Sequence, residues 1–347
     1  MTSNLHFCCP KCKTPLLEEE NCFKCRVCQV EWSIDSDIPS FITNEFYWNQ
    51  ISKENMNRLL QIARDEGWRV ALEKILLPLT NRYTFNYAVN ESRADWHFML
   101  PAKTDAEILD LGCGWGPVTI PLARHYRTVV GADTTAETLK FLQIRAKQEK
   151  IENIKLAHVD PLDYGNLPFS DSQFDLVVMN GMLEWIGAAR LDMPPQACQQ
   201  LALTEIRRIL KPNGIIYIGI ENRFSLDNFL GSGSHSKVPF ADILPRPLAN
   251  LWCKMVGKKD GYRTYIYSSF EYKKLLFQCG YNDFSLFLPI PSYRDPCLII
   301  PTDNEKIIKY YVEHSINSIP KKQLGRFVPL SVKLFATDYS ITASAAK

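Results

Sequence analysis

The sequence predicts a doubly wound α/β domain that follows a small cysteine-rich unit. Between residues 105 and 222, apolar runs of strand length alternate with segments whose apolar residues recur at helical spacing. This alternation is typical of a parallel sheet covered by helices. In addition, six of the eleven cysteines fall between residues 8 and 28. Such a cluster indicates a unit that is stabilised by a metal ion or by disulfides.

The first predicted strand ends in a glycine-rich loop. An apolar run, 108–111, leads into Gly112, Gly114 and Gly116, and a helical pattern begins at residue 118. Glycines allow backbone dihedrals and a close ligand approach that side chains would prevent. The loop reads G-x-G-x-G and has no lysine, unlike the glycine loops that bind phosphates. Asp110 at the strand end would repel a phosphate and suits a ligand with a cationic or amino end.

The other elements follow in order along the chain. A second strand, 127–133, ends at Asp133, roughly twenty residues after the glycine loop. At this spacing a carboxylate meets ribose hydroxyls in doubly wound sheets. The further predicted elements are a helix at 136–150, strands at 154–159 and 174–180, a helix at 199–210, a strand at 215–220 and a closing antiparallel strand at 335–343.

Together these motifs resemble class I S-adenosylmethionine-dependent methyltransferases over about residues 105–222. The resemblance implies a seven-stranded, Rossmann-like methyltransferase sheet with S-adenosylmethionine at the strand tips. Asp133 would accept both ribose hydroxyls, and Asp160 would bind the adenine amino group. The other implied cofactor residues are Asp110, Gly112, Cys113, Gly114 and Gly116 at the amino-acid half, Thr134 next to Asp133, and Asn180 and Leu183 on the methyl-donor side.

Two of these acids have simpler interpretations. Asp133 could cap the helix that follows it, although Thr134 or Thr135 could fill that position instead. Asp160 precedes Pro161 and could be an ordinary turn residue.

Four cysteines have the spacing of a structural zinc site. Cys9 and Cys12 form one C-x-x-C pair, and Cys25 and Cys28 form another after twelve intervening residues. Four thiolates around one zinc ion make a closed structural site. A second register stays open because Cys22 and Cys25 form a third, overlapping pair.

A reduced, zinc-bound state is favoured over disulfides. No secretory signal precedes the cysteines and the remaining five are scattered, so a cytoplasmic location is expected. Pro10 suits a metal knuckle, and Trp32 falls on the strand leaving it, which favours the first register. The segment resembles the zinc ribbon of the small activator subunit of RNA and protein methyltransferases, and the ribbon that begins rRNA guanine-N1 methyltransferases. The resemblance implies zinc and allows a protein partner at the ribbon.

The predicted organisation has three parts. Residues 1–45 form the zinc ribbon, and residues 46–104 form a helical cap or linker, because their apolar residues recur on one helical face. Residues 105–347 form the methyltransferase domain, with a substrate-side insertion at about 222–335. No apolar run is long enough to predict a membrane span.

The charge distribution bears on the substrate. Residues 1–45 carry four Lys and Arg against seven Asp and Glu, whereas residues 231–347 carry 16 against nine. A ribbon that reads RNA should be basic, because phosphate contacts supply most nucleic-acid affinity. RNA is therefore disfavoured as a partner. The basic C-terminal part is either a solvated surface or a face for an anionic substrate.

Candidate catalytic residues follow the fifth strand. Methyl transfer to a hydroxyl needs a base that removes the acceptor's proton. Glu221 stands at the tip of this strand, and His235 lies in a glycine-rich loop, 231–236. Arg263 and Arg294 lie in polar, aromatic clusters. The simpler interpretations are a surface histidine for His235 and structural ion pairs for the two arginines.

The C-terminal pieces resemble methyltransferases encoded among bacterial cell-surface polysaccharide and natural-product genes. This implies a small-molecule or glycan-type acceptor with a hydroxyl or amine. Two alternatives stay open, a guanine-N1-type RNA base methyltransferase and a non-enzymatic scaffold with this fold. The tip at 180–185 lacks the Asn/Asp-Pro-Pro-aromatic sequence typical of adenine-methylating enzymes. The intact glycines and acids of the cofactor site argue against the scaffold.

Overall fold

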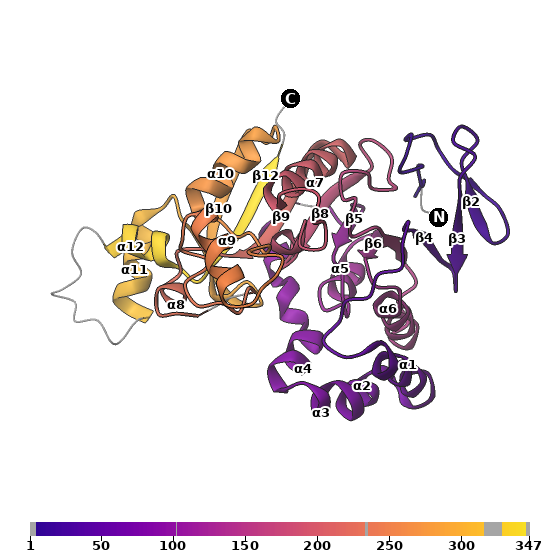
Figure 1. Ribbon diagram of the computed structural model, residues 1–347, viewed down its shortest axis with the longest axis horizontal. Coiled ribbons are helices and arrows are strands. Elements are labelled where there is room, and N and C mark those ends of the chain that lie inside the picture. Colours follow the sequence, from indigo (N-terminus) through magenta and orange to yellow (C-terminus); the bar gives the residue numbers. More distant parts are fainter. Residues whose placement is uncertain (1–4, 102, 233–234, 316–327, 345–347) are drawn as a thin grey trace. The chain divides into compact units, whose positions relative to one another are not determined.

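The computed structural model describes residues 5–101, 103–232, 235–315 and 328–344 (Figure 1). The chain divides into two compact units. Unit 1 comprises Met1–Met179 and Thr204–Ile215, and unit 2 comprises Asn180–Leu203 and Ile216–Lys347. Helix α7 (Pro195–Ile209) and strand β9 (Leu210–Glu221) contribute residues to both units.

A parallel sheet forms the centre of unit 1. β5 (Glu107–Leu111) pairs with β6 (Thr128–Asp133) on one side and with β8 (Phe174–Asn180) on the other, and β7 (Ile154–Val159) pairs with β6. Every residue of β5 is buried, as expected for a central parallel strand. The register sets Leu111 opposite Ala132. The strand-end loops that carry the predicted cofactor residues therefore start side by side.

Two helices follow these strands, α5 (Thr119–His125) after β5 and α6 (Ala136–Gln148) after β6. Residues 53–99 are also mostly helical, and the first helices of this segment pack on α6. Their elements are α1 (Lys53–Glu66), α2 (Trp68–Ala71), the π-helix η1 (Leu72–Leu76), α3 (Leu77–Leu79), α4 (Arg82–Val89) and the 3-10 helix η2 (Glu91–Met99). The apolar face of α1 joins Trp115 and Phe141 in one buried cluster. This cluster holds the glycine loop, through Trp115, and helix α6, through Phe141, against the N-terminal helices.

The cysteine-rich segment joins the same sheet. Its strands are β1 (Leu17–Glu18), β2 (Cys22–Lys24), β3 (Glu31–Asp35) and β4 (Ile38–Phe41). The first three connections are antiparallel, whereas β4 pairs in parallel with β7. The ring of Phe7 contacts the rings of Phe23, Phe41 and Phe169. These contacts merge the small aromatic core of the ribbon with the edge of the sheet.

Unit 2 has its own strand set, ordered β9-β12-β10-β11, to which β9 contributes 216–221. β10 (Asp283–Ser292) is antiparallel to both β11 (Asp295–Pro301) and β12 (Asp338–Ser344). The helices of this unit are the 3-10 helix η3 (Leu183–Trp185), α8 (Leu226–Phe229), α9 (Arg246–Met255), α10 (Ser269–Gln278), α11 (Glu305–Ser315) and α12 (Val328–Phe335).

The structure corrects three details of the predicted fold. The described residues form twelve strands rather than seven, because the ribbon adds β1–β4 and a hairpin adds β11. The fifth central strand, β9, is longer than predicted and starts at Leu210. The last strand starts at Asp338, because Phe335 ends helix α12. No helix in the described part of the chain is both long and apolar enough to span a bilayer.

Candidate functional site

The glycine loop after β5 uses its glycines in two ways. Gly112, Gly114 and Gly116 have φ angles of +81°, +50° and +83°, values that L-residues with side chains rarely adopt. A Cβ at Gly116 would lie 2.4 Å from Cδ1 of Leu142, so this glycine allows the loop to pack on α6. A Cβ at Gly114 would meet nothing within 4 Å. The loop therefore packs on α6 at Gly116 and is open at Gly114.

Asp133, the last residue of β6, holds this loop. Its Oδ2 accepts a hydrogen bond from the amide of Gly114 at 2.9 Å, and its Oδ1 accepts one from the amide of Thr135 at 3.0 Å. Burial raises the pKa of its carboxyl group. Thr135 is the N-cap residue of α6, but its hydroxyl donates to the carbonyl of Trp48 rather than capping the helix. Asp133 thus links the glycine loop to the turn after β6.

Asp110 is a buried acid beneath the loop. Its Oδ2 accepts a hydrogen bond from the hydroxyl of Thr119 at 2.6 Å. Burial raises the pKa of Asp110 to about 6, because a charged carboxylate is poorly solvated there. Cys113 is also buried, and burial raises the pKa of its thiol. Cys113 packs with Ile120 and Leu142 in a small apolar cluster.

Asp160, after β7, already has several partners. Its Oδ2 accepts hydrogen bonds from the amide and the hydroxyl of Thr43, at 3.0 and 2.6 Å, and its Oδ1 accepts one from the amide of Leu162. The hydrogen bond from Leu162 fits the interpretation of Asp160 as a turn residue, whereas the two from Thr43 come from a distant segment. A cavity of about 220 Å³ lies beside it and is lined by ribbon residues that include Trp32 and Thr43. The carbonyl of Thr134, in the neighbouring turn, is hydrogen-bonded to Nε2 of His158.

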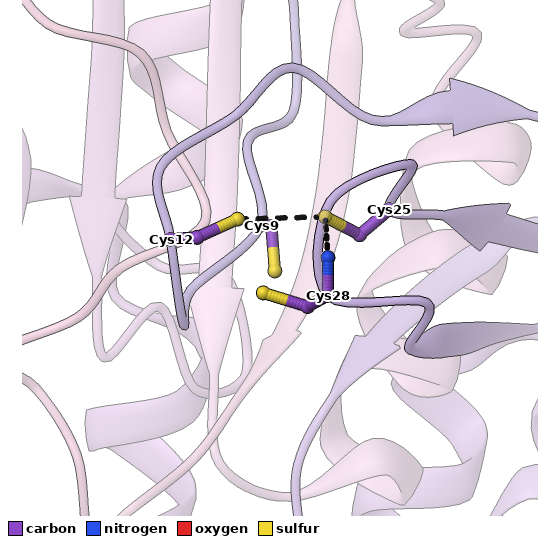
Figure 2. A group of neighbouring side chains, drawn as sticks. All are labelled: Cys9, Cys12, Cys25 and Cys28. Carbon is purple, nitrogen blue, oxygen red and sulfur yellow. Dashed lines mark hydrogen bonds between the residues drawn. The ribbon is translucent and has the colours of Figure 1, made fainter.

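The four cysteines of the favoured register lie together (Figure 2). The sulfur atoms of Cys9, Cys12, Cys25 and Cys28 are all within 4.8 Å of one another. The Sγ atoms of Cys12 and Cys25 are 3.4 Å apart, and Cys25 Sγ accepts a hydrogen bond from the amide of Cys28. The structure does not bring the other two N-terminal cysteines into this group. Cys8 Sγ lies 3.2 Å from the Ser170 hydroxyl, and Cys22 Sγ points to Glu19.

Both cysteine pairs have the same local geometry. After Cys12, Lys13 has a positive φ and its amide bonds the carbonyl of Cys9. After Cys28, Gln29 has a positive φ and its amide bonds the carbonyl of Cys25. Hydrogen bonding to Thr14 lowers the pKa of Cys12 to about 6. These paired knuckles offer four sulfur ligands to one tetrahedral ion.

In unit 2, the two predicted methyl-donor residues lie near the end of β8. Leu183 is buried in η3, and its carbonyl accepts a hydrogen bond from Gln199. Asn180 is also buried, and it faces Gly219, where a Cβ would lie 2.2 Å from Asn180 Oδ1 and 2.8 Å from the ring of Tyr293. Only glycine at position 219 leaves room for both side chains.

The same corner of unit 2 brings together the two predicted catalytic residues. Glu221 Oε1 lies 2.8 Å from His235 Nε2, accepts a hydrogen bond from the hydroxyl of Tyr293 at 3.1 Å and forms an ion pair with Arg294. Glu221 is largely buried, and the ring of His235 contacts Trp185 edge to face. The ion-pair interpretation of Arg294 is thus what the structure shows. Residues 233 and 234 of the predicted loop lie outside the described residues.

A third member of this cluster, Glu184, is not among the predicted site residues. Its side chain is fully buried, and its Oε1 lies 3.3 Å from His235 Nε2. Within the described residues, neither oxygen of Glu184 has a hydrogen-bond partner. The sequence signal was an acid four residues after Asn180, inside an otherwise apolar tip. Two buried carboxylates therefore face one imidazole.

This cluster has the composition of an acid–base site. Glu184, Glu221 and His235 are close enough to ligate one cation. However, the guanidinium of Arg294 already forms an ion pair with Glu221. Its positive charge opposes the binding of a divalent ion at the same carboxylate. Arg263 belongs to no such cluster, because it donates to the backbone carbonyls of Gly187, Arg190 and Met193.

Comparisons with known proteins agree on the fold and the domain. Residues 109–218 match the family described as "Methyltransferase domain". The chain is 36% identical over 113 residues to a demethylmenaquinone methyltransferase of Lactiplantibacillus plantarum, covering 31% of this chain and 42% of that protein. It is 30% identical over 151 residues to the mitochondrial ubiquinone biosynthesis O-methyltransferase of Rattus norvegicus, covering 44% of this chain and 40% of that protein. The chain thus spans less than half the length of these relatives.

A solved phosphoethanolamine N-methyltransferase 1 of Haemonchus contortus, in complex with phosphoethanolamine and S-adenosylhomocysteine, aligns with 87% of this chain and 52% of its own. The sequence identity is 16% and the TM-score is 0.46, too low to bear on function. The predicted resemblance to class I S-adenosylmethionine-dependent methyltransferases is confirmed by the family match and the curated relatives. The Rossmann-like character of the predicted sheet is confirmed as well.

Proposed function

We propose that this chain, which carries a class I S-adenosylmethionine-dependent methyltransferase domain, transfers a methyl group to a small molecule. The observation that carries the proposal is the loop between β5 and α5, open at Gly114 and tied to the carboxylate of Asp133. The two curated relatives described above are named as a demethylmenaquinone methyltransferase and a ubiquinone biosynthesis O-methyltransferase. They support a small-molecule acceptor and give no support to the glycan-type acceptor that the sequence implied.

The residues of unit 1 fit the amino-acid and ribose parts of S-adenosylmethionine. Asp133 offers a charged acceptor for the ribose hydroxyls, and the open side of Gly114 leaves room for a ligand. The carboxylate of Asp110 suits the ammonium group. When bound, the cofactor supplies an electrophilic methyl group on a sulfonium. Asp160 remains a proposed adenine ligand that would share its carboxylate with Thr43.

We assign the acceptor's proton to the cluster in unit 2. His235 removes the proton from the acceptor hydroxyl or amine, and Glu221 stabilises the imidazolium that results. Tyr293 and Arg294 hold Glu221 in place. Glu184 adds a second buried carboxylate beside the same imidazole nitrogen.

The cysteine cluster is assigned a structural zinc ion. Cys9, Cys12, Cys25 and Cys28 provide four sulfur ligands and leave no position for a substrate. The ion would hold the two knuckles together, and β4 would transmit this stability to the sheet through its pairing with β7. A protein partner at the ribbon remains a prediction from the resemblance.

Replacing Asp133 with alanine should weaken binding of S-adenosylmethionine by about 2–4 kcal/mol, because a charge-assisted pair of hydrogen bonds is lost. Isothermal titration calorimetry on both proteins measures the change. Asp105→Ala, which removes an exposed acid from the same unit, is the matched control and should bind normally. Equal affinity of Asp133→Ala and the parent protein would show that the ribose is held elsewhere.

Cofactor affinity should also depend on pH through Asp110. Its raised pKa means that protonated Asp110 stabilises the ligand-free fold, fully below a pH of 3.8 and no longer once the pH rises through about 6. A bound ammonium favours the carboxylate instead, so affinity should rise by roughly tenfold between about pH 5 and pH 7 and then level off. Calorimetry across this range measures the rise. Asp110→Asn should abolish it; a variant that keeps the same rise would exclude Asp110 as its source.

A further inference from the structure

Helix α9 of unit 2 buries small residues and exposes large apolar ones. The residues that it buries are small: Ala249 and Cys253 pack with Val238, Ala241 and Tyr262. Its large apolar residues point outward. Leu248, Leu251, Trp252 and Met255 are 53%, 56%, 36% and 70% exposed. A helix that only served the fold would turn its large apolar residues inward, so the outward face requires another explanation.

The four outward residues form one continuous stripe. They are spaced i, i+3, i+4 and i+7, which places them on one side of the helix. We call this stripe the α9 face. The indole nitrogen of Trp252 donates to the carbonyl of Pro239, so the stripe borders the loop before α9. In that loop Phe240, which is 44% exposed, has its ring over Gly231. Beside Gly231, Leu230 is 83% exposed and extends the apolar surface.

Basic residues accompany the α9 face. Lys254 lies on the helix beside the stripe, and Lys258 and Lys259 follow its end, all of them exposed. Within the described residues, none of these three lysines forms an ion pair. The acids in this stretch are Asp242, which is buried and bonded to the hydroxyl of Tyr262, and the exposed Asp260. The surface therefore combines exposed leucine, tryptophan and methionine with unneutralised positive charge.

We propose that the α9 face is a docking surface for an anionic lipid bilayer. A helix that lies in the plane of a membrane has this composition, with apolar residues among the acyl chains and lysines at the headgroups. Tryptophan at the margin of the stripe matches the preference of indole for the interface. A symmetric contact with a second copy of this chain would bring the lysine clusters together, and like charges disfavour that. The proposal does not depend on the catalytic assignment.

Vesicle sedimentation with the full chain tests the proposal. The probes are vesicles of phosphatidylcholine alone and of phosphatidylcholine with about one third phosphatidylglycerol, at low and high salt. The protein should sediment with the anionic vesicles, and high salt should release part of it because screening weakens the lysine contribution. Lys254→Gln/Lys258→Gln/Lys259→Gln should lower the partition coefficient at least about tenfold. Leu248→Ser/Leu251→Ser/Met255→Ser should do the same by removing apolar burial.

The matched control is Phe270→Ser/Phe277→Ser, which removes two exposed rings from α10 and should leave sedimentation unchanged. Circular dichroism of each variant confirms that it is folded. Three results would overturn the proposal. One is an absence of binding to either vesicle, and another is equal binding of the folded α9 variant and the parent. The third is a dimer in sedimentation velocity that the α9 variant dissociates, which would make the face a contact between copies.

Discussion

Replacing His235 with alanine should lower the rate of methyl transfer by about 10²–10⁴-fold, the usual contribution of a positioned general base. Affinity for S-adenosylmethionine should stay the same, because the residues proposed to hold its amino-acid and ribose parts belong to unit 1. The physical reason is the environment of the imidazole. Glu221 and Glu184 lie 2.8 Å and 3.3 Å from Nε2 of His235, and both stabilise the imidazolium that forms when the ring takes the acceptor's proton. Without the imidazole, the cluster has no basic nitrogen at the position that receives the acceptor's proton.

Release of S-adenosylhomocysteine in the presence of a small-molecule metabolite pool measures the rate, and calorimetry measures cofactor affinity. His314→Ala is the matched control, because His314 is on α11, where it bonds the carbonyl of Tyr310 one turn earlier and stacks on its ring. Glu221→Gln should also lower the rate, since it removes the charge that stabilises the imidazolium. Unchanged product release by His235→Ala, with normal cofactor binding, would remove His235 from the mechanism and leave the cofactor site in place.

Replacing Cys25 with serine should abolish zinc binding and destabilise the protein. Cys25 belongs to both possible second cysteine pairs, so the site is lost whichever register holds zinc. The parent protein, purified without a chelator, should contain about one zinc per chain. Loss of a structural metal is among the larger single-residue effects, at least about 4 kcal/mol. The ribbon would loosen, and the sheet would lose support at β7, with which β4 pairs.

Cys22→Ser provides a control with the same substitution in the same ribbon. Cys22 lies outside the four-sulfur group and points to Glu19, so this variant should keep its zinc and its melting temperature. Metal analysis and thermal unfolding of both variants decide the question. Zinc loss in Cys22→Ser would mean that the overlapping register binds the metal. A well-folded, metal-free parent protein would show that the cysteines stabilise the ribbon without an ion.

Much of the candidate site could be predicted because its signals are local. The three glycines of 112–116 mark a backbone that residues with side chains rarely follow, and all three have positive φ angles. The geometry of each cysteine pair could be predicted from its C-x-x-C spacing, because each knuckle is closed by backbone hydrogen bonds within a few residues. The central parallel strands could be predicted because they are largely buried and most of their residues are apolar.

Glu184 shows where such signals stop. Its neighbours in the sequence give no hint of a partner, and the partner imidazole is supplied by a loop about fifty residues later. Asp160 shows the same limit from the other side. The family resemblance implies a ligand contact for Asp160, but the ribbon residue Thr43 donates two hydrogen bonds to its carboxylate. Both outcomes depend on which distant segments meet, and residue pattern alone does not encode that choice.

The sequence by itself thus determined the fold class, the glycine loop and the cysteine knuckles, because backbone dihedrals and strand burial are set within a few residues. Only the tertiary structure decided that β4 would pair with β7, that β12 would enter between β9 and β10, and that Glu184, Glu221 and His235 would share one corner of unit 2. It also decided which side of α9 faces outward. The physical reason is that an amphipathic pattern identifies an apolar face, whereas packing against the rest of the chain decides whether that face is covered.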